Sequence, residues 1–76
     1  MQQIYVKFNS VDQVNQFVNL IDQFDVNFEL GLGRRTVDAK SIMGILAMDL
    51  SQPLILRYDS DDYRIKESIS SLLFEK

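Results

Sequence analysis

The side chains that could do chemistry in this sequence are hydroxyl and carboxyl groups, because its 76 residues include no histidine and no cysteine. Without these residue types, disulfides, the usual zinc ligands and a histidine-based hydrolytic triad are excluded. Two candidates remain, a serine at the start of an expected short helix, Ser41, and an acidic run at residues 59–62. No pairing of carboxylates or tyrosines stands out as catalytic, so we predict that the protein is not an enzyme and needs no cofactor.

The acidic run, Asp59-Ser60-Asp61-Asp62, could in principle bind a cation. The calcium-loop pattern is absent, since its glycine and terminal glutamate do not occur at the required spacing. Helix capping explains the run, with Ser60 as the N-cap and two aspartates in the first turn, where the helix dipole favours them. We therefore predict no metal site.

Ser41 is a good N-cap for a short helix that extends to about Ala47. A phosphate on this hydroxyl would lie at a helix N-terminus, where free N–H groups favour an anion, although the cap alone also accounts for the serine. The helix then offers more apolar residues than one narrow stripe can bury, namely Ile42, Met43, Ile45, Leu46 and Met48. We predict that some of them lie at the surface as a contact patch, with core packing as the alternative.

Alternation of apolar and polar residues predicts strands at 4–8, 26–30, 35–39 and 53–58. Three helices are expected. The first begins at Ser10, with Gln13 completing a capping box, and ends near residue 23; the second begins at Ser41 and the third at Ser60. Glycines at 31 and 33 predict a turn that joins the second and third strands as a hairpin.

On the first helix, Val11 begins the expected apolar stripe. The predicted core is Val6, Phe8, Val14, Phe17, Val18, Ile21, Val37, Leu54, Leu56, Ile65, Ile69 and Leu72.

The element order is β-α-β-β-α-β-α, which predicts an α+β open-faced sandwich with a four-stranded antiparallel sheet and three helices on one face. We expect residues 1–76 to form one domain, because the chain is short and 46% hydrophobic. A net charge of -3 lacks the basic footprint of proteins that bind nucleic acid or anionic membranes. Neither a signal-peptide pattern nor an apolar segment of about 18 residues is visible, so a cytoplasmic location is expected.

Residues 36–46, Thr-Val-Asp-Ala-Lys-Ser-Ile-Met-Gly-Ile-Leu, resemble the regulatory-serine segment of HPr, the phosphocarrier protein of the bacterial sugar phosphotransferase system. The element order is also similar to that of the HPr family. The resemblance implies that Ser41 occupies the position phosphorylated by a dedicated bifunctional kinase/phosphorylase. It also implies that Ile42, Met43 and Leu46, with Lys40 beside them, form a docking surface for partner proteins.

The resemblance has one large departure. HPr carries its phosphoryl group on a histidine within a His-Ala-Arg-Pro-like run at the start of the first helix, whereas this chain has no histidine. Counting back from Ser41 without gaps puts Ser10 at the histidine's place and Asp12 at the arginine's. A serine without a base is a poor nucleophile, and an aspartate would repel an incoming phosphoryl group. The chain therefore resembles a histidine-less HPr-like paralogue.

These features predict a regulatory or adaptor protein in bacterial sugar and carbon regulation, including carbon catabolite repression, controlled by phosphorylation of Ser41. The expected partners are proteins, namely an HPr-type serine kinase/phosphorylase and a catabolite-control transcription factor, with no direct contact to nucleic acid or membrane. The alternative is a diverged interaction module that has the HPr fold and no role in the phosphotransferase system. A small acidic enzyme or ligand-binding domain is a weaker third reading, for which the sequence shows no site.

Overall fold

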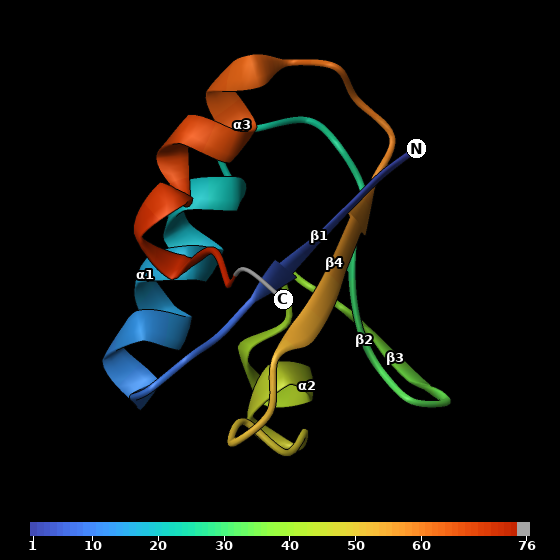
Figure 1. Cartoon of the computed structure of the whole chain (residues 1–76). Coiled ribbons are helices and arrows are strands. Elements are labelled where there is room, and N and C mark those ends of the chain that lie inside the picture. The colour runs from blue at the N-terminus through green and yellow to red at the C-terminus, as the bar shows by residue number, and fades with distance from the viewer. Residues whose placement is uncertain (75–76) are drawn as a thin grey trace.

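The computed structural model describes residues 1–74 of the chain. Its strands and α-helices follow one another in the expected order β-α-β-β-α-β-α, and a short 3₁₀ helix ends the series (Figure 1). The elements are β1 (Gln2–Val6), α1 (Val11–Ile21), β2 (Phe28–Leu32), β3 (Arg35–Asp38), α2 (Ile42–Leu46), β4 (Leu54–Tyr58), α3 (Tyr63–Ser68) and the 3₁₀ helix η1 (Ser70–Leu72).

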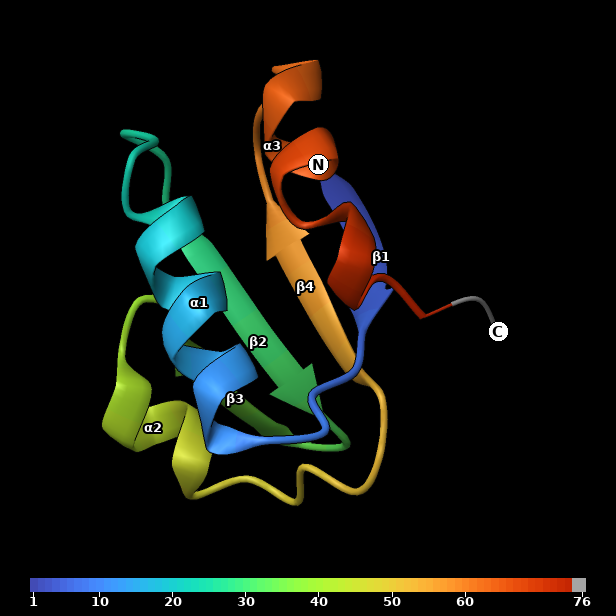
Figure 2. The same cartoon turned by 90° about the vertical axis from the view of Figure 1, so that its left-hand side faces the viewer.

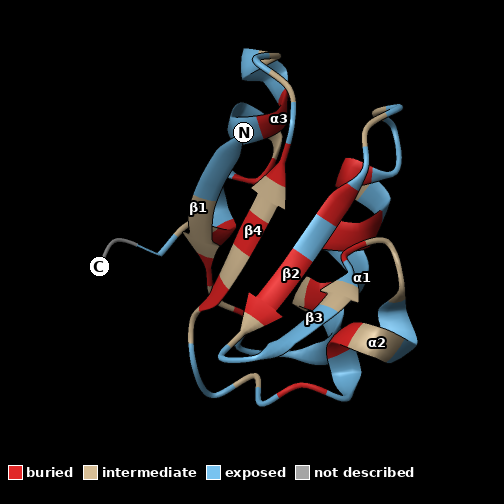
Figure 3. Ribbon diagram, turned by 90° about the vertical axis from the view of Figure 1, so that its right-hand side faces the viewer, coloured by how far each residue is buried: buried red, intermediate tan, exposed pale blue. Residues whose placement is uncertain are grey.

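The four strands form one antiparallel sheet in the order β1-β4-β2-β3. Helices α1 and α3 lie in front of this sheet in Figure 2, and α2 lies at its lower end, in contact with α1 and β3. No helix of residues 1–74 covers the opposite face of the sheet (Figure 3). The predicted α+β fold, with a four-stranded antiparallel sheet and three helices, is confirmed.

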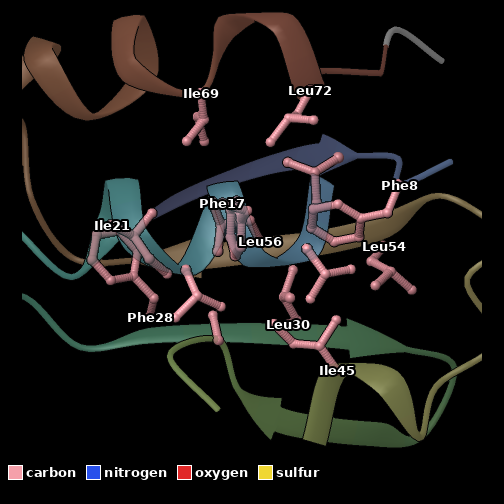
Figure 4. Packing of buried hydrophobic residues seen from close by; sticks show 14 of the residues in the cluster. Phe8, Phe17, Ile21, Phe28, Leu30, Ile45, Leu54, Leu56, Ile69 and Leu72 are labelled. Carbon is pink, nitrogen blue, oxygen red and sulfur yellow. The ribbon is translucent and has the colours of Figure 1, made fainter. Parts of the chain in front are cut away.

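The core lies between the sheet and the helices, where apolar side chains from both layers meet (Figure 4). Phe8 and Phe17 pack edge to face with ring centroids 5.1 Å apart, and Phe28 packs on Tyr58 at 5.3 Å. Every residue of the predicted core is buried except Val37, which is half-buried because β3 is an edge strand. The buried hydrophobic residues that the prediction left out are Phe28, Leu30, Ala39, Ile45, Met48 and Tyr58.

Helix α1 begins as its capping residues predict. Ser10 Oγ accepts a hydrogen bond from the backbone N–H of Gln13 at 3.2 Å, and Gln13 Oε1 accepts one from the N–H of Asn9 at 2.6 Å. The assignment of Val11 to the buried stripe was wrong, since its side chain is 54% exposed. Val11 is the first helical residue, ahead of the turn that packs on the sheet. The helix ends at Ile21, two residues before the predicted end.

Strand β2 lies two residues later than predicted, whereas β3 begins at Arg35 as predicted. Gly31 was assigned to the turn, but it belongs to β2 and pairs with both Thr36 and Ile55. The turn consists of Gly33 and Arg34, and Gly33 has a φ of 61°, which a glycine adopts without steric cost. The strand extends through Gly31 because it has sheet partners on both sides, which local turn propensity does not take into account.

The start of α3 was also misplaced. Asp62, and not Ser60, is the N-cap, because its carboxylate accepts the backbone N–H of Arg64 at 3.0 Å. Ser60 Oγ instead accepts the N–H of Asp62 at 3.1 Å and closes the turn that precedes the helix. The acidic residues therefore lie before the helix, with none in its first turn.

Candidate functional site

Ser41 is the N-cap of α2. Its Oγ accepts a hydrogen bond from the backbone N–H of Gly44 at 3.1 Å, and its own N–H donates to the carbonyl of Asp38 at 3.0 Å. The residue is half-buried. The cap role predicted for Ser41 is therefore present, and the backbone of the β3–α2 turn fixes the position of the hydroxyl.

The apolar residues of α2 divide between core and surface. Ile45 is fully buried, and Met48, just beyond the helix, is nearly so. Met43 is 80% exposed, while Ile42 and Leu46 are exposed at 36% and 38%. Figure 3 shows α2 with both buried and exposed segments at the end of the sheet. We call Ile42, Met43 and Leu46 the α2 patch; these are the three apolar residues that the sequence assigned to a partner interface.

Gly44 allows α2 to pack closely. A side-chain carbon at this position would lie 3.2 Å from Ser41 Oγ and 3.3 Å from Cβ of Val37 on β3. Contacts this short force neighbouring atoms to move. The glycine therefore lowers helix propensity but lets the helix approach β3, which brings Ser41 and the α2 patch against the end of the sheet.

Lys40, the remaining residue of the predicted interface, interacts within the protein. Its ammonium donates to the carbonyl oxygen of Phe24 at 2.8 Å and lies 5.7 Å from the ring centroid of Phe28. The side chain is half-buried. In this structure Lys40 joins the α2 turn to the α1–β2 loop, a structural role that the sequence pattern did not reveal.

Ser10 lies at the other site considered, the β1–α1 junction. A shallow cleft of about 370 Å³ is lined there by residues 7–11 and 50–51. The ammonium of Lys7 donates to the carbonyls of Phe8 and Leu50 and to Asn9 Oδ1, at 3.2–3.3 Å. Lys7 therefore connects the β1–α1 loop to the segment before β4 and holds the two sides of this cleft together. The sequence did not predict this role, because Lys7 there is simply a polar residue of an alternating strand. The correspondence of Ser10 to the carrier histidine stays a prediction.

The acidic run supports α3. The carboxylate of Asp62 pairs with the guanidinium of Arg64 at 2.7 Å, and hydrogen bonds from the Arg64 side chain and backbone hold the pKa of Asp62 below its ordinary value of 3.8. The guanidinium also lies 5.8 Å from the Phe24 ring centroid. Over residues 1–74 no three acidic groups gather where they could hold a metal ion.

The arrangement of these elements is that of a known protein class. The family described as "PTS HPr component phosphorylation site" matches residues 12–62, which is more than half of the chain. The chain belongs to this PTS HPr family. The matched range includes Ser41 and the whole α2 patch, and it begins two residues after Ser10.

The structure is also similar to the crystal structure of a phosphocarrier protein HPr from Bacillus anthracis str. Ames. The match has a TM-score of 0.70 and 21% sequence identity, and it covers 96% of this chain and 94% of that chain. At this identity the match shows the fold. No curated protein sequence matches the chain. Within the described residues, no helix has the length and apolar character needed to cross a membrane.

Proposed function

We propose that this chain is a cytoplasmic, single-domain regulatory or adaptor protein that acts through protein–protein contacts at the α2 patch and is controlled by phosphorylation of Ser41. It has the HPr fold without a histidine to carry the phosphoryl group, and we assign it no enzymatic activity. The observation that carries the proposal is the exposure of Ile42, Met43 and Leu46 next to the capped hydroxyl of Ser41. The partners that we propose are an HPr-type serine kinase/phosphorylase and a catabolite-control transcription factor.

Exposure of these side chains is costly unless a partner covers them. Met43 is more exposed than any apolar residue described in the chain except Met1. Flexible, polarisable methionines suit surfaces that contact proteins, and a Met flanked by two half-exposed aliphatic residues provides an apolar centre. Lys40 is engaged with Phe24, so the three apolar residues carry the proposed surface.

Phosphorylation would change this surface without disturbing the core. A phosphate on Ser41 adds about two negative charges at neutral pH beside the α2 patch. A partner that covers the patch with apolar groups alone would be weakened, because burial of an unpaired dianion is costly. A partner that presents arginine or lysine opposite Ser41 would be strengthened by charge-assisted hydrogen bonds.

The test of regulation is incubation with an HPr-type serine kinase and ATP, followed by peptide mapping. We expect phosphoserine at Ser41 in the wild type and none in Ser41→Ala. The matched control is Ser10→Ala, which removes the other serine N-cap and leaves Ser41 in place. A folded wild type that gains no phosphate at Ser41 would favour the alternative, a diverged HPr-fold interaction module outside the phosphotransferase system.

The test of the interface is a pair of polar substitutions at exposed apolar positions. Met43→Gln should weaken capture of a catabolite-control transcription factor or of the kinase, while Tyr63→Gln should not. Tyr63 is 72% exposed, similar to Met43, but it lies on α3 at the opposite end of the molecule (Figure 1). Equal effects of the two substitutions would place the interface elsewhere.

A further inference from the structure

On the helix-free face of the sheet, the side chain of Arg57 covers a glycine, Gly31. On this face β2 presents Glu29 and Gly31, and β4 presents Ile55 and Arg57, because their neighbours Leu30, Leu54 and Leu56 point into the core. Gly31 pairs directly with Ile55 and has no side chain to cover the strand. A cleft of about 340 Å³ lies beside this position, lined by Tyr5, Gly31, Leu32, Gly33, Gln52, Pro53 and Ile55.

The guanidinium of Arg57 lies over the backbone of Gly31, which is buried. A side-chain carbon at Gly31 would be 2.8 Å from Arg57 Nη1 and 3.7 Å from Cζ. Any residue larger than glycine would therefore displace the arginine head group. The arginine is half-buried, and its position in the register is opposite Glu29, so it reaches along the sheet toward the cleft.

Arg57 differs in its partners from the other half-buried cations of residues 1–74. Lys7 and Lys40 donate hydrogen bonds to carbonyl oxygens. Within residues 1–74, the Arg57 guanidinium makes no hydrogen bond or ion pair, even though Glu29 is its cross-strand neighbour. Its planar fork of N–H donors is thus free to receive a ligand, and a carboxylate matches that fork in two parallel hydrogen bonds.

We propose that this cleft binds a small carboxylate with a flat apolar body. The carboxylate would pair with Arg57, and the apolar body would lie beside Gly31, against the side chains of Ile55 and Pro53 that line the cleft. The volume is at the lower end of the range for small-molecule sites, which suits a single ring or a short branched chain. The proposal concerns the helix-free face of the sheet and does not depend on the proposed function.

The test is a titration of the ¹⁵N-labelled protein with benzoate, followed by NMR, with benzamide as the uncharged probe of the same shape. We expect benzoate to shift the Gly31 amide and the Arg57 Nε–H signals saturably, and benzamide to bind about tenfold or more weakly, since about 1.4 kcal/mol corresponds to a factor of ten. This comparison uses the wild type only, so it decides the role of the carboxylate even where a variant fails to fold. Equal shifts by the two probes, or no saturable shift with benzoate, would overturn the proposal.

Three variants test the residues. Arg57→Gln should weaken benzoate about tenfold or more, and Gly31→Ala should also weaken it by displacing the guanidinium. The charge-matched control is Arg34→Gln, at an exposed turn position next to Gly33 of the cleft, which should leave affinity within about twofold. Binding by Arg57→Gln that stays within twofold of wild type, with the amide spectrum intact, would mean that Arg57 merely covers the strand.

Discussion

Asp62 performs two tasks at the start of α3. One of its carboxylate oxygens accepts the backbone N–H of Arg64 at 3.0 Å, which caps the helix, and both oxygens accept hydrogen bonds from the Arg64 guanidinium. The guanidinium in turn approaches the Phe24 ring, so a local pair also connects α3 with the α1–β2 loop. These contacts favour the ionised carboxylate, which is why the pKa of Asp62 is lowered in the folded protein.

The lowered pKa gives a pH dependence of definite sign. Because the folded-state pKa of Asp62 lies below the ordinary value of 3.8, its contribution to stability is present above that value and is lost as the pH falls through the folded pKa. Asp62→Asn keeps a good N-cap but removes the charge pair. We expect the difference in urea midpoint between wild type and Asp62→Asn to be largest near neutral pH and to vanish in acid below the folded pKa.

Asp49 is a second carboxylate that contributes to the pH dependence of stability. Hydrogen bonds from the side chains of Ser51 and Gln52 lower its pKa as well, so it also contributes to acid unfolding. Asp62→Asn should therefore reduce the acid sensitivity without abolishing it. A difference in midpoint that stays constant across the whole pH range would show that the Arg64 pair contributes nothing to stability.

At the scale of elements, α2 shows how packing overrides propensity. A helix of five residues that contains a glycine is marginal by itself. It persists because Ile45 is buried and Gly44 allows the helix to lie against Val37 and Ser41. The sequence showed the cost of the glycine; only the close approach to β3 shows what offsets it.

We expect Gly44→Ala to lower the free energy of unfolding in spite of its better helix propensity. Alanine favours a helix over glycine by about 1 kcal/mol, but its Cβ would crowd Ser41 Oγ and Cβ of Val37, and overpacking of this kind typically costs about 1–3 kcal/mol. Urea denaturation measures the net change. A gain in stability of the size expected from propensity would contradict the close packing of α2 on β3.

The sequence predicted those elements whose boundaries depend on local patterns. Ser10 and Ser41 cap their helices as expected, and the alternation on β1 and β4 gave the core face of the sheet. The errors lie where long-range pairing decides. Gly31 was placed in a turn, although it is paired on both sides within the sheet. The contact of the Lys40 ammonium with Phe24, which is distant in sequence, was likewise not visible in the local pattern, and the place of Lys40 in a partner interface stays a prediction.

For the whole molecule, stability depends on a small core that both layers share. Phe17 is fully buried and packs edge to face on Phe8, so Phe17→Ala should cost about 3–5 kcal/mol. A chain of this length has a total stability of only about 4–11 kcal/mol, so the variant should be partly unfolded at moderate urea concentration. Val11→Ala on the same helix is the control, and it should change stability by no more than about 0.5 kcal/mol because Val11 is mostly exposed. A small effect at Phe17 would mean that the core is loosely packed.

The absence of histidine predicts that the protein cannot accept a phosphoryl group from the phosphotransferase system, and this can be tested directly. Incubation with the first enzyme of the phosphotransferase system and phosphoenolpyruvate should leave the intact mass of the wild type unchanged, because no imidazole is present to accept the phosphoryl group. An HPr that contains the histidine is the positive control, and an acid-labile gain of one phosphate by the wild type would show that another residue has taken over the role.

If Ser10 occupies the place of the carrier histidine, the loss should be partly reversible. Ser10 is the N-cap of α1, and Asp12 lies exposed in the first turn, where its carboxylate would repel an incoming phosphoryl group. We therefore expect the double variant Ser10→His/Asp12→Arg to gain an acid-labile phosphate, and Ser10→His alone to gain less. The exchange sacrifices the serine cap, so a melting curve must first show that α1 is retained at a cost of about 1 kcal/mol. A folded double variant that gains no phosphate would have two explanations: the counting from Ser41 has misplaced the site, or the β1–α1 loop held by Lys7 no longer admits the enzyme. Adding Lys7→Met to the double variant separates them. A gain of phosphate after this change would point to the loop, and no gain would point to a misplaced site.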